Sequence, residues 1–129
     1  MKKILILISF VLITVNLYAK QSYQSFDEKV VREYMQVSQL LVFGTHLGDG
    51  EQKLDGIKYA KKALEWMKDH NMDLNSTLAA HVYYTIGSSM GNDKKAKVYV
   101  VKSYETFKKS LGEGDPQTQQ IKKILRDFY

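Results

Sequence analysis

The residues in this sequence most able to do chemistry are its three histidines, His46, His70 and His81. They form no HExxH pair, and because the chain contains no cysteine their spacing fits no common zinc pattern. His46 and Asp49 are spaced so that they could share a metal ion at a helix end, but a surface imidazole near a helix C-terminus is the interpretation we favour. We expect His81, which stands beside an apolar helix position, to be a partly buried and hydrogen-bonded residue.

Other catalytic and cofactor-binding patterns are missing from the sequence. The acids Asp49, Glu51 and Asp55 lack the alternation and terminal glutamate of a calcium-binding loop. There is no GxSxG motif, no phosphate-cradling GxxxxGK motif and no cysteine nucleophile. We therefore predict no metal, no cofactor and no catalytic residue. A small enzyme is the third alternative, and it would need a perturbed acid or base in a deep pocket.

Lysine is concentrated between positions 94 and 109, with Tyr99 and Tyr104 interleaved. This composition is compatible with an anionic ligand such as an acidic glycan, although a solvated helix face is its commoner cause. The formal charge of +5 is a mild balance for 129 residues, so we expect no nucleic acid partner. The alternative anionic-ligand face consists of Lys94, Lys95, Lys97, Lys102, Lys108 and Lys109.

The first nineteen residues have the layout of a secretory signal peptide. Lys2 and Lys3 precede an almost unbroken apolar run, Ile4 to Val15, and Ala19 is a small residue at the expected cleavage point. The run is shorter than the ~20 residues that span a bilayer. We expect residues 1–19 to be removed, leaving no membrane span, and residues 20–24 to be a disordered polar segment. The style of the N-terminus indicates a bacterial protein in the periplasm or outside the cell.

The rest of the chain, residues 25–129, predicts a single all-α domain of about five helices. Apolar residues recur every three or four positions, and no long stretch alternates with a period of two. Ser25, Asn75 or Ser76, and Asp115 are the expected caps, with Pro116 in the first turn of the last helix. The first helix is expected to run to about Leu47. The expected buried faces of the first two helices are Phe26, Val30, Tyr34, Val37 and Leu41, then Leu54, Ile57, Ala60, Leu64 and Met67.

Two helical hairpins in the chain are related by one constant shift, which places Tyr59 on Tyr99 and Glu65 on Glu105. Gly91-Asn92-Asp93-Lys94-Lys95-Ala96 has the form of an inter-helix turn, and Leu111 to Pro116 that of a linker. With Leu40, Phe43-Gly44, Leu47 and Ala63-Leu64, the pattern resembles the longer form of the tetratricopeptide repeat. Tyr84 departs from it, because that family has a small residue there. The repeats are expected at about 37–72 and 77–112, with a capping helix at 116–129.

The resemblance implies a short right-handed solenoid of antiparallel hairpins that binds a protein or peptide partner. In such repeats the first helix of each pair lines a concave groove for a peptide or a partner helix. The alternative is that these side chains pack against the N-terminal helix and no groove exists. With only two repeats, pairing with a second copy is a further alternative. Carried over by register, the groove positions are Ser38, Leu41, Thr45, Leu78, His81, Thr85 and Ser89.

Overall fold

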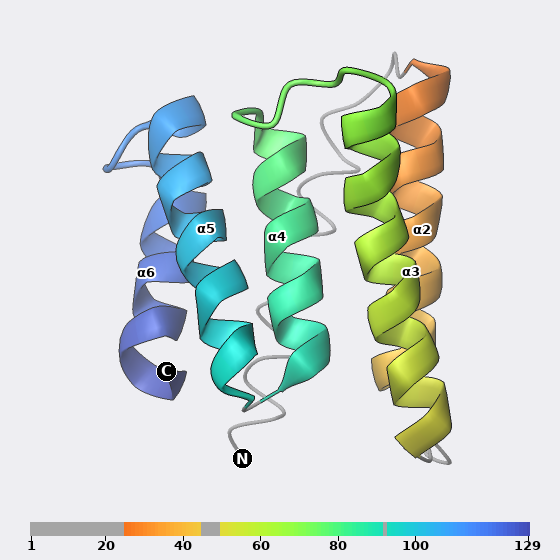
Figure 1. The fold of residues 1–129 in the computed structure, drawn as a ribbon. Coiled ribbons are helices and arrows are strands. Elements are labelled where there is room, and N and C mark those ends of the chain that lie inside the picture. The colour runs from red at the N-terminus through yellow and green to blue at the C-terminus, as the bar shows by residue number, and fades with distance from the viewer. Residues whose placement is uncertain (1–24, 45–49, 92) are drawn as a thin grey trace.

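A computed structural model describes residues 25–44, 50–91 and 93–129. Within those ranges the chain forms α-helices and no strand, which confirms the all-α class (Figure 1). The predicted signal peptide, the polar segment 20–24, His46 and Asp49 lie outside the described residues. The helices are α2 (Phe26–Phe43), α3 (Gly50–Asp69), α4 (Thr77–Met90), α5 (Lys94–Leu111) and α6 (Pro116–Phe128).

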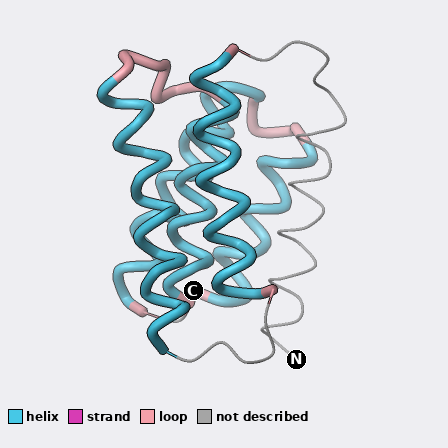
Figure 2. Tube along the Cα trace, turned by 90° about the vertical axis from the view of Figure 1, so that its right-hand side faces the viewer, coloured by secondary structure: helices cyan, strands magenta, loops and turns pink. Residues whose placement is uncertain are grey.

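The helices pack in consecutive pairs. α2 pairs with α3, and α4 pairs with α5; α4 also packs on both α2 and α3, which joins the two hairpins. The last helix, α6, packs on α5. The helices therefore follow one another across the molecule in chain order (Figure 1), and their axes run along a common direction when seen from the side (Figure 2). This repeat-like arrangement leaves α4 as the central helix.

Side-chain caps set the starts of four helices. Ser25 Oγ accepts a hydrogen bond from the Glu28 N–H at 3.2 Å, and Ser76 Oγ accepts from the Ala79 N–H at 3.1 Å. Asp93 and Asp115 accept from N–H groups two residues on. Each of these bonds satisfies one backbone donor that has no partner inside its helix. The caps expected at Ser25, Ser76 and Asp115 are thus confirmed.

Three details of the helix predictions are wrong. α2 ends at Phe43 with Gly44 as its C-cap, not near Leu47; glycine has a low helix propensity, which favours an end there. The buried stripe of α2 is also rotated from the expected one. Phe26 and Val37 are exposed, whereas Val31 and Met35 are buried, because this helix packs against both α3 and α4. Leu54 of α3, also expected in the core, is 64% exposed.

Glycines allow the paired helices to approach closely. A Cβ atom added at Gly87 of α4 would lie 2.7 Å from Val100 Cγ2 and 3.1 Å from the Ala96 carbonyl oxygen of α5. Gly56 of α3 lies equally close to α2. Tyr84 does not interrupt this contact: it is buried in a second core cluster with Val100 of α5 and residues of α6. The large side chain at position 84 is accommodated because α6 provides the opposite wall of that cluster.

Two apolar clusters hold the helices together. One joins α2, α3 and α4 around Val31, Met35, Met67, Val82 and Ile86. The other joins α4, α5 and α6 and includes Phe107, Ile121 and Ile124. Because α4 contributes to both clusters, both hairpins and α6 depend on the same central helix.

Candidate functional site: a polar cluster around His81

The central helix α4 carries polar side chains into the interior of the protein. Its sequence, TLAAHVYYTIGSSM, contains no Asp, Glu, Lys or Arg, and every residue from Leu78 to Ser89 except Tyr83 is buried. A helix that packs against neighbours on several sides buries its polar residues. Each of these must form a hydrogen bond, or else the rest of the fold must offset the free energy lost when the group leaves water. The polar residues of α4 are therefore the natural place to look for a site.

Most of the buried hydroxyl groups are satisfied within the protein. Thr85 donates to the His81 carbonyl oxygen at 2.8 Å, and Ser89 donates to the Thr85 carbonyl oxygen at 2.6 Å. The hydroxyls of Ser89 and Ser38 are 3.3 Å apart, which links α4 to α2. These groups are positioned by the helices themselves and need no further partner.

His81 lies where side chains from four helices converge. It is only 4% exposed, and its ring meets the edge of Phe107 from α5 with the ring centres 4.9 Å apart. Arg32 of α2 and Gln117 of α6 are its polar neighbours. Burial lowers the pKa of His81 to about 3; the positive charge of Arg32 lowers it further, and a hydrogen bond to the Gln117 side chain, which favours the charged ring, opposes both. His81 is therefore neutral at physiological pH.

His81 and Gln117 interact through their side chains, but three buried polar atoms of α4 and α6 make no hydrogen bond of standard geometry among the described residues. They are His81 Nε2, Gln117 Oε1 and Thr118 Oγ1. Each such atom costs about 1–3 kcal/mol, so protein interiors contain few of them. Two belong to α6 and one to α4, and α6 makes no extensive packing contact with α2 or α4 among the described helices. We call Arg32, Ser38, His81, Thr85, Ser89, Gln117 and Thr118 the His81 cluster.

The structure brings together part of the set predicted from register. Ser38, Leu78, His81, Thr85 and Ser89 are all buried on α2 and α4, and Leu41 is half-buried. Thr45 lies outside the described residues. Three members of the cluster were missed. Arg32 reads as a solvent-facing charge within a helix, and Gln117 and Thr118 belong to a helix that had been assigned only a capping role. No sequence signal distinguishes them, because their burial depends on how α2 and α6 are placed beside α4.

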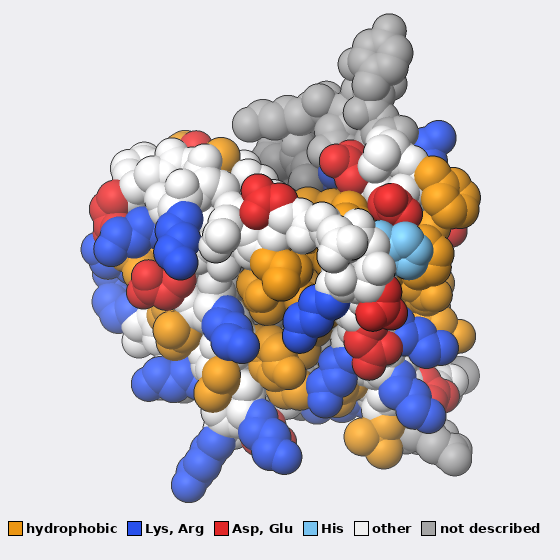
Figure 3. All heavy atoms as spheres, turned by 45° about the horizontal axis from the view of Figure 1, so that its top comes forward, with side chains coloured by type: hydrophobic (Ala, Val, Ile, Leu, Met, Phe, Trp, Pro, Cys, Tyr) orange, Lys and Arg blue, Asp and Glu red, His pale blue; other side chains and the backbone are white. Residues whose placement is uncertain are grey.

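The predicted anionic-ligand face is a separate, solvent-exposed surface on α5. All six of its lysines are exposed. Lys102 extends over the rings of Tyr83 and Tyr99, with its nitrogen 5.8 and 6.0 Å from their centres. Hydrophobic side chains reach the surface between basic ones on the side of the molecule seen in Figure 3.

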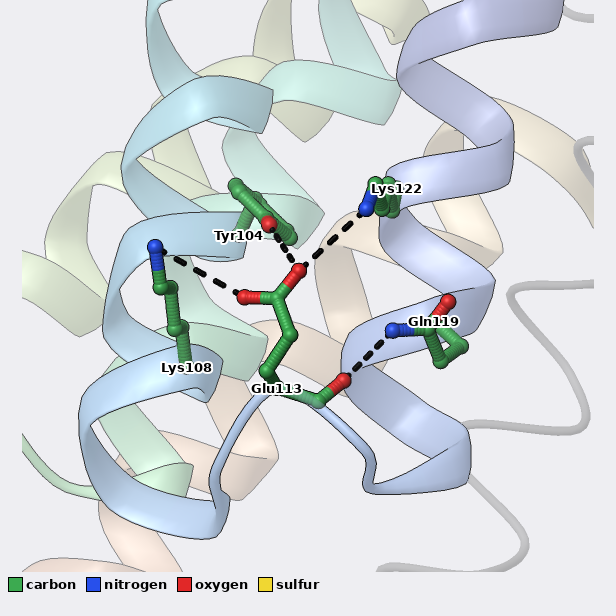
Figure 4. A network of polar contacts seen from close by, with 5 residues as sticks. All are labelled: Tyr104, Lys108, Glu113, Gln119 and Lys122. Atoms are coloured by element: carbon green, nitrogen blue, oxygen red, sulfur yellow. Dashed lines mark hydrogen bonds and ion pairs between the residues drawn. The ribbon is translucent and has the colours of Figure 1, made fainter.

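One lysine of this face belongs to an ordered contact between α5 and α6. Figure 4 shows the Glu113 carboxylate accepting a hydrogen bond from Tyr104 at 2.8 Å and pairing with Lys122 at 3.3 Å and Lys108 at 3.6 Å. Gln119 also donates to the Glu113 carbonyl oxygen. The Tyr104 hydrogen bond, followed by that of Lys122, lowers the pKa of Glu113. These exposed contacts fix the α5–α6 loop.

The described residues offer little for metal chemistry. Nowhere in them do three or more His, Asp or Glu side chains come together as metal ligands would. In the same ranges, none of the helices combines the length and the apolar character needed to cross a membrane.

Comparison of this chain with family models, with curated proteins and with solved structures found no match.

Proposed function

We propose that this protein is an interaction module that binds an extended peptide or a partner helix at the face shared by α2, α4 and α6. The proposal rests on three polar atoms of the His81 cluster that make no hydrogen bond of standard geometry among the described residues, namely His81 Nε2, Gln117 Oε1 and Thr118 Oγ1. A peptide carries a backbone donor and a backbone acceptor at each residue. It is therefore the kind of ligand that can pair with a ring nitrogen, an amide oxygen and a hydroxyl group.

The arrangement of the helices also supports a peptide ligand. α2, α4 and α6 are the first helices of successive units, and α4 lies between the other two. α6 packs mainly on α5, and it also shares an apolar cluster with Tyr84 of α4, so opening the face between α2 and α6 requires α6 to shift within that cluster. The arrangement resembles the way in which tetratricopeptide repeats present the first helix of each pair to a partner. Opening is required, because His81 and Thr118 are almost inaccessible here.

The test is selection of peptides from a displayed random library on the full chain, followed by affinity measurement for the enriched sequences. We expect His81→Leu and Thr118→Val to weaken binding about tenfold each, because each removes one hydrogen-bonding group at nearly constant volume. Lys123→Gln on the exposed side of α6 is the matched control and should leave the affinity unchanged. Failure to enrich any sequence, or equal losses in all three variants, would reject the proposal.

A further inference from the structure

The outward face of α5 combines exposed apolar side chains with a net positive charge, and Glu105, the single acid of the helix, lies on the same face. Val98 is 55% exposed and Val101 is 37% exposed. With Lys94 they follow the spacing of three or four residues that places side chains on one helix face. The buried residues of α5, such as Val100 and Phe107, are on its opposite side. The exposed valines are thus not the edge of the core but part of a separate surface.

The charge on this surface is largely uncompensated. α5 contains six lysines and a single acid, Glu105. Within the described residues Lys108 alone of the six forms an ion pair, with Glu113. The other five cations repel one another on one helix. An opposing surface with negative charge would remove this repulsion.

We propose that the face of α5 formed by Lys94, Val98, Val101, Lys102 and Lys109 docks onto a lipid surface that carries anionic headgroups. The lysines would lie at the level of the headgroups, and the two valines at the boundary of the acyl chains. Helices that lie in a membrane interface have this combination of basic and apolar side chains. Tyr99, beneath the Lys102 ammonium group, is of a residue type enriched at membrane interfaces.

The valines decide between a lipid surface and a soluble polyanion. A polyanion such as an acidic glycan would be held by the lysines alone and would leave Val98 and Val101 in water. A lipid surface uses both features. This docking involves no residue of the His81 cluster, so the membrane proposal and the peptide-binding proposal can be tested independently.

The experiment is co-sedimentation of the full chain with vesicles of phosphatidylcholine, with and without phosphatidylglycerol. The N-terminal run Ile4 to Val15 is the same in every variant, so differences between variants report on α5. We expect binding to rise with the phosphatidylglycerol content. Lys94→Gln combined with Lys109→Gln should lower the partition coefficient roughly fivefold per lysine. Lys29→Gln with Lys123→Gln removes the same charge from α2 and α6 and should have a much smaller effect.

A second set of variants separates the apolar contribution from the electrostatic one. Val98→Ser with Val101→Ser should weaken vesicle binding several-fold and leave binding to soluble heparin unchanged. Glu105→Gln should strengthen vesicle binding, because it removes a negative charge from an exposed position of α5. This single variant still tests the proposal if one of the double variants loses its helical circular dichroism and does not fold. Equal binding to neutral vesicles, equal effects of the two lysine pairs, or no effect of the valine changes would overturn the proposal; the last would indicate a polyanion site.

Discussion

Acid should destabilise this protein through His81 in particular. The pKa of this side chain is 6.5 in the unfolded chain and is lowered to about 3 in the folded protein, chiefly by burial. Between these two values the unfolded chain binds a proton that the folded protein does not. The free energy of unfolding must therefore fall as the pH falls below 6.5, and the loss is complete near pH 3.

The size of this effect follows from the width of the pH window. Each pKa unit corresponds to about 1.4 kcal/mol, so the whole window amounts to roughly 5 kcal/mol. A typical domain is stable by only about 5–15 kcal/mol. The protonation of one buried ring is therefore comparable, near pH 3, to the whole stability of a marginally stable domain, unless the His81 cluster opens and lets water reach the ring.

The assay is urea unfolding followed by far-ultraviolet circular dichroism, at a series of pH values, for the wild-type chain and for His81→Leu. Carboxylates titrate in both proteins, so their contribution cancels in the difference. The stability of the wild type relative to the variant should fall by about 1.4 kcal/mol for each pH unit below 6.5. Nuclear magnetic resonance of the His81 ring proton measures the same pKa directly.

Parallel pH profiles for the two proteins would refute this reasoning. They would mean that the His81 ring titrates normally in the folded state and is hydrated, contrary to its burial. If His81→Leu does not fold, His81→Gln provides the same comparison. Replacing Arg32 by Met should raise the pKa of His81 only part of the way back to 6.5, because burial is the larger cause of the shift. A return of the pKa to 6.5 would mean that the charge of Arg32, and not burial, is the main cause.

Further predictions concern the core and the two proposed surfaces. Phe107→Ala should reduce the free energy of unfolding by about 3–5 kcal/mol, since the ring is fully buried; a loss below about 1 kcal/mol in urea unfolding would remove Phe107 from the core. Gly87→Ala should destabilise by about 1–3 kcal/mol, because the added methyl group meets backbone atoms of α5, whereas Gly114→Ala, which meets nothing within 4 Å, serves as the control in the same thermal unfolding scan. Peptide affinity should depend on His81 and Thr118, and vesicle binding should depend on the lysines and valines of α5, as measured above.

Local sequence signals were sufficient for the all-α class and for three of the helix starts, but not for the end of α2. Ser25, Ser76 and Asp115 cap the helices at the expected positions, because a cap depends on a hydrogen bond between residues two or three apart. The all-α class followed from periodicity for the same reason. Periodicity did not predict which face of α2 is buried, because apolar residues occur on more than one side of this helix. The contacts with α3 and α4 bury Val31 and Met35, and they leave Phe26 and Val37 exposed.

The candidate site, in contrast, depended on tertiary structure. Register alone placed Ser38, His81, Thr85 and Ser89 on one surface, and they do lie in one cluster. Arg32, Gln117 and Thr118 joined it only because α2 and α6 lie on either side of α4. The sequence by itself determined where three of the helices begin and which side chains are basic, since these are properties of neighbouring residues. Burial, and with it the depressed pKa of His81, is a property of helices far apart in the chain, and only their packing decided it.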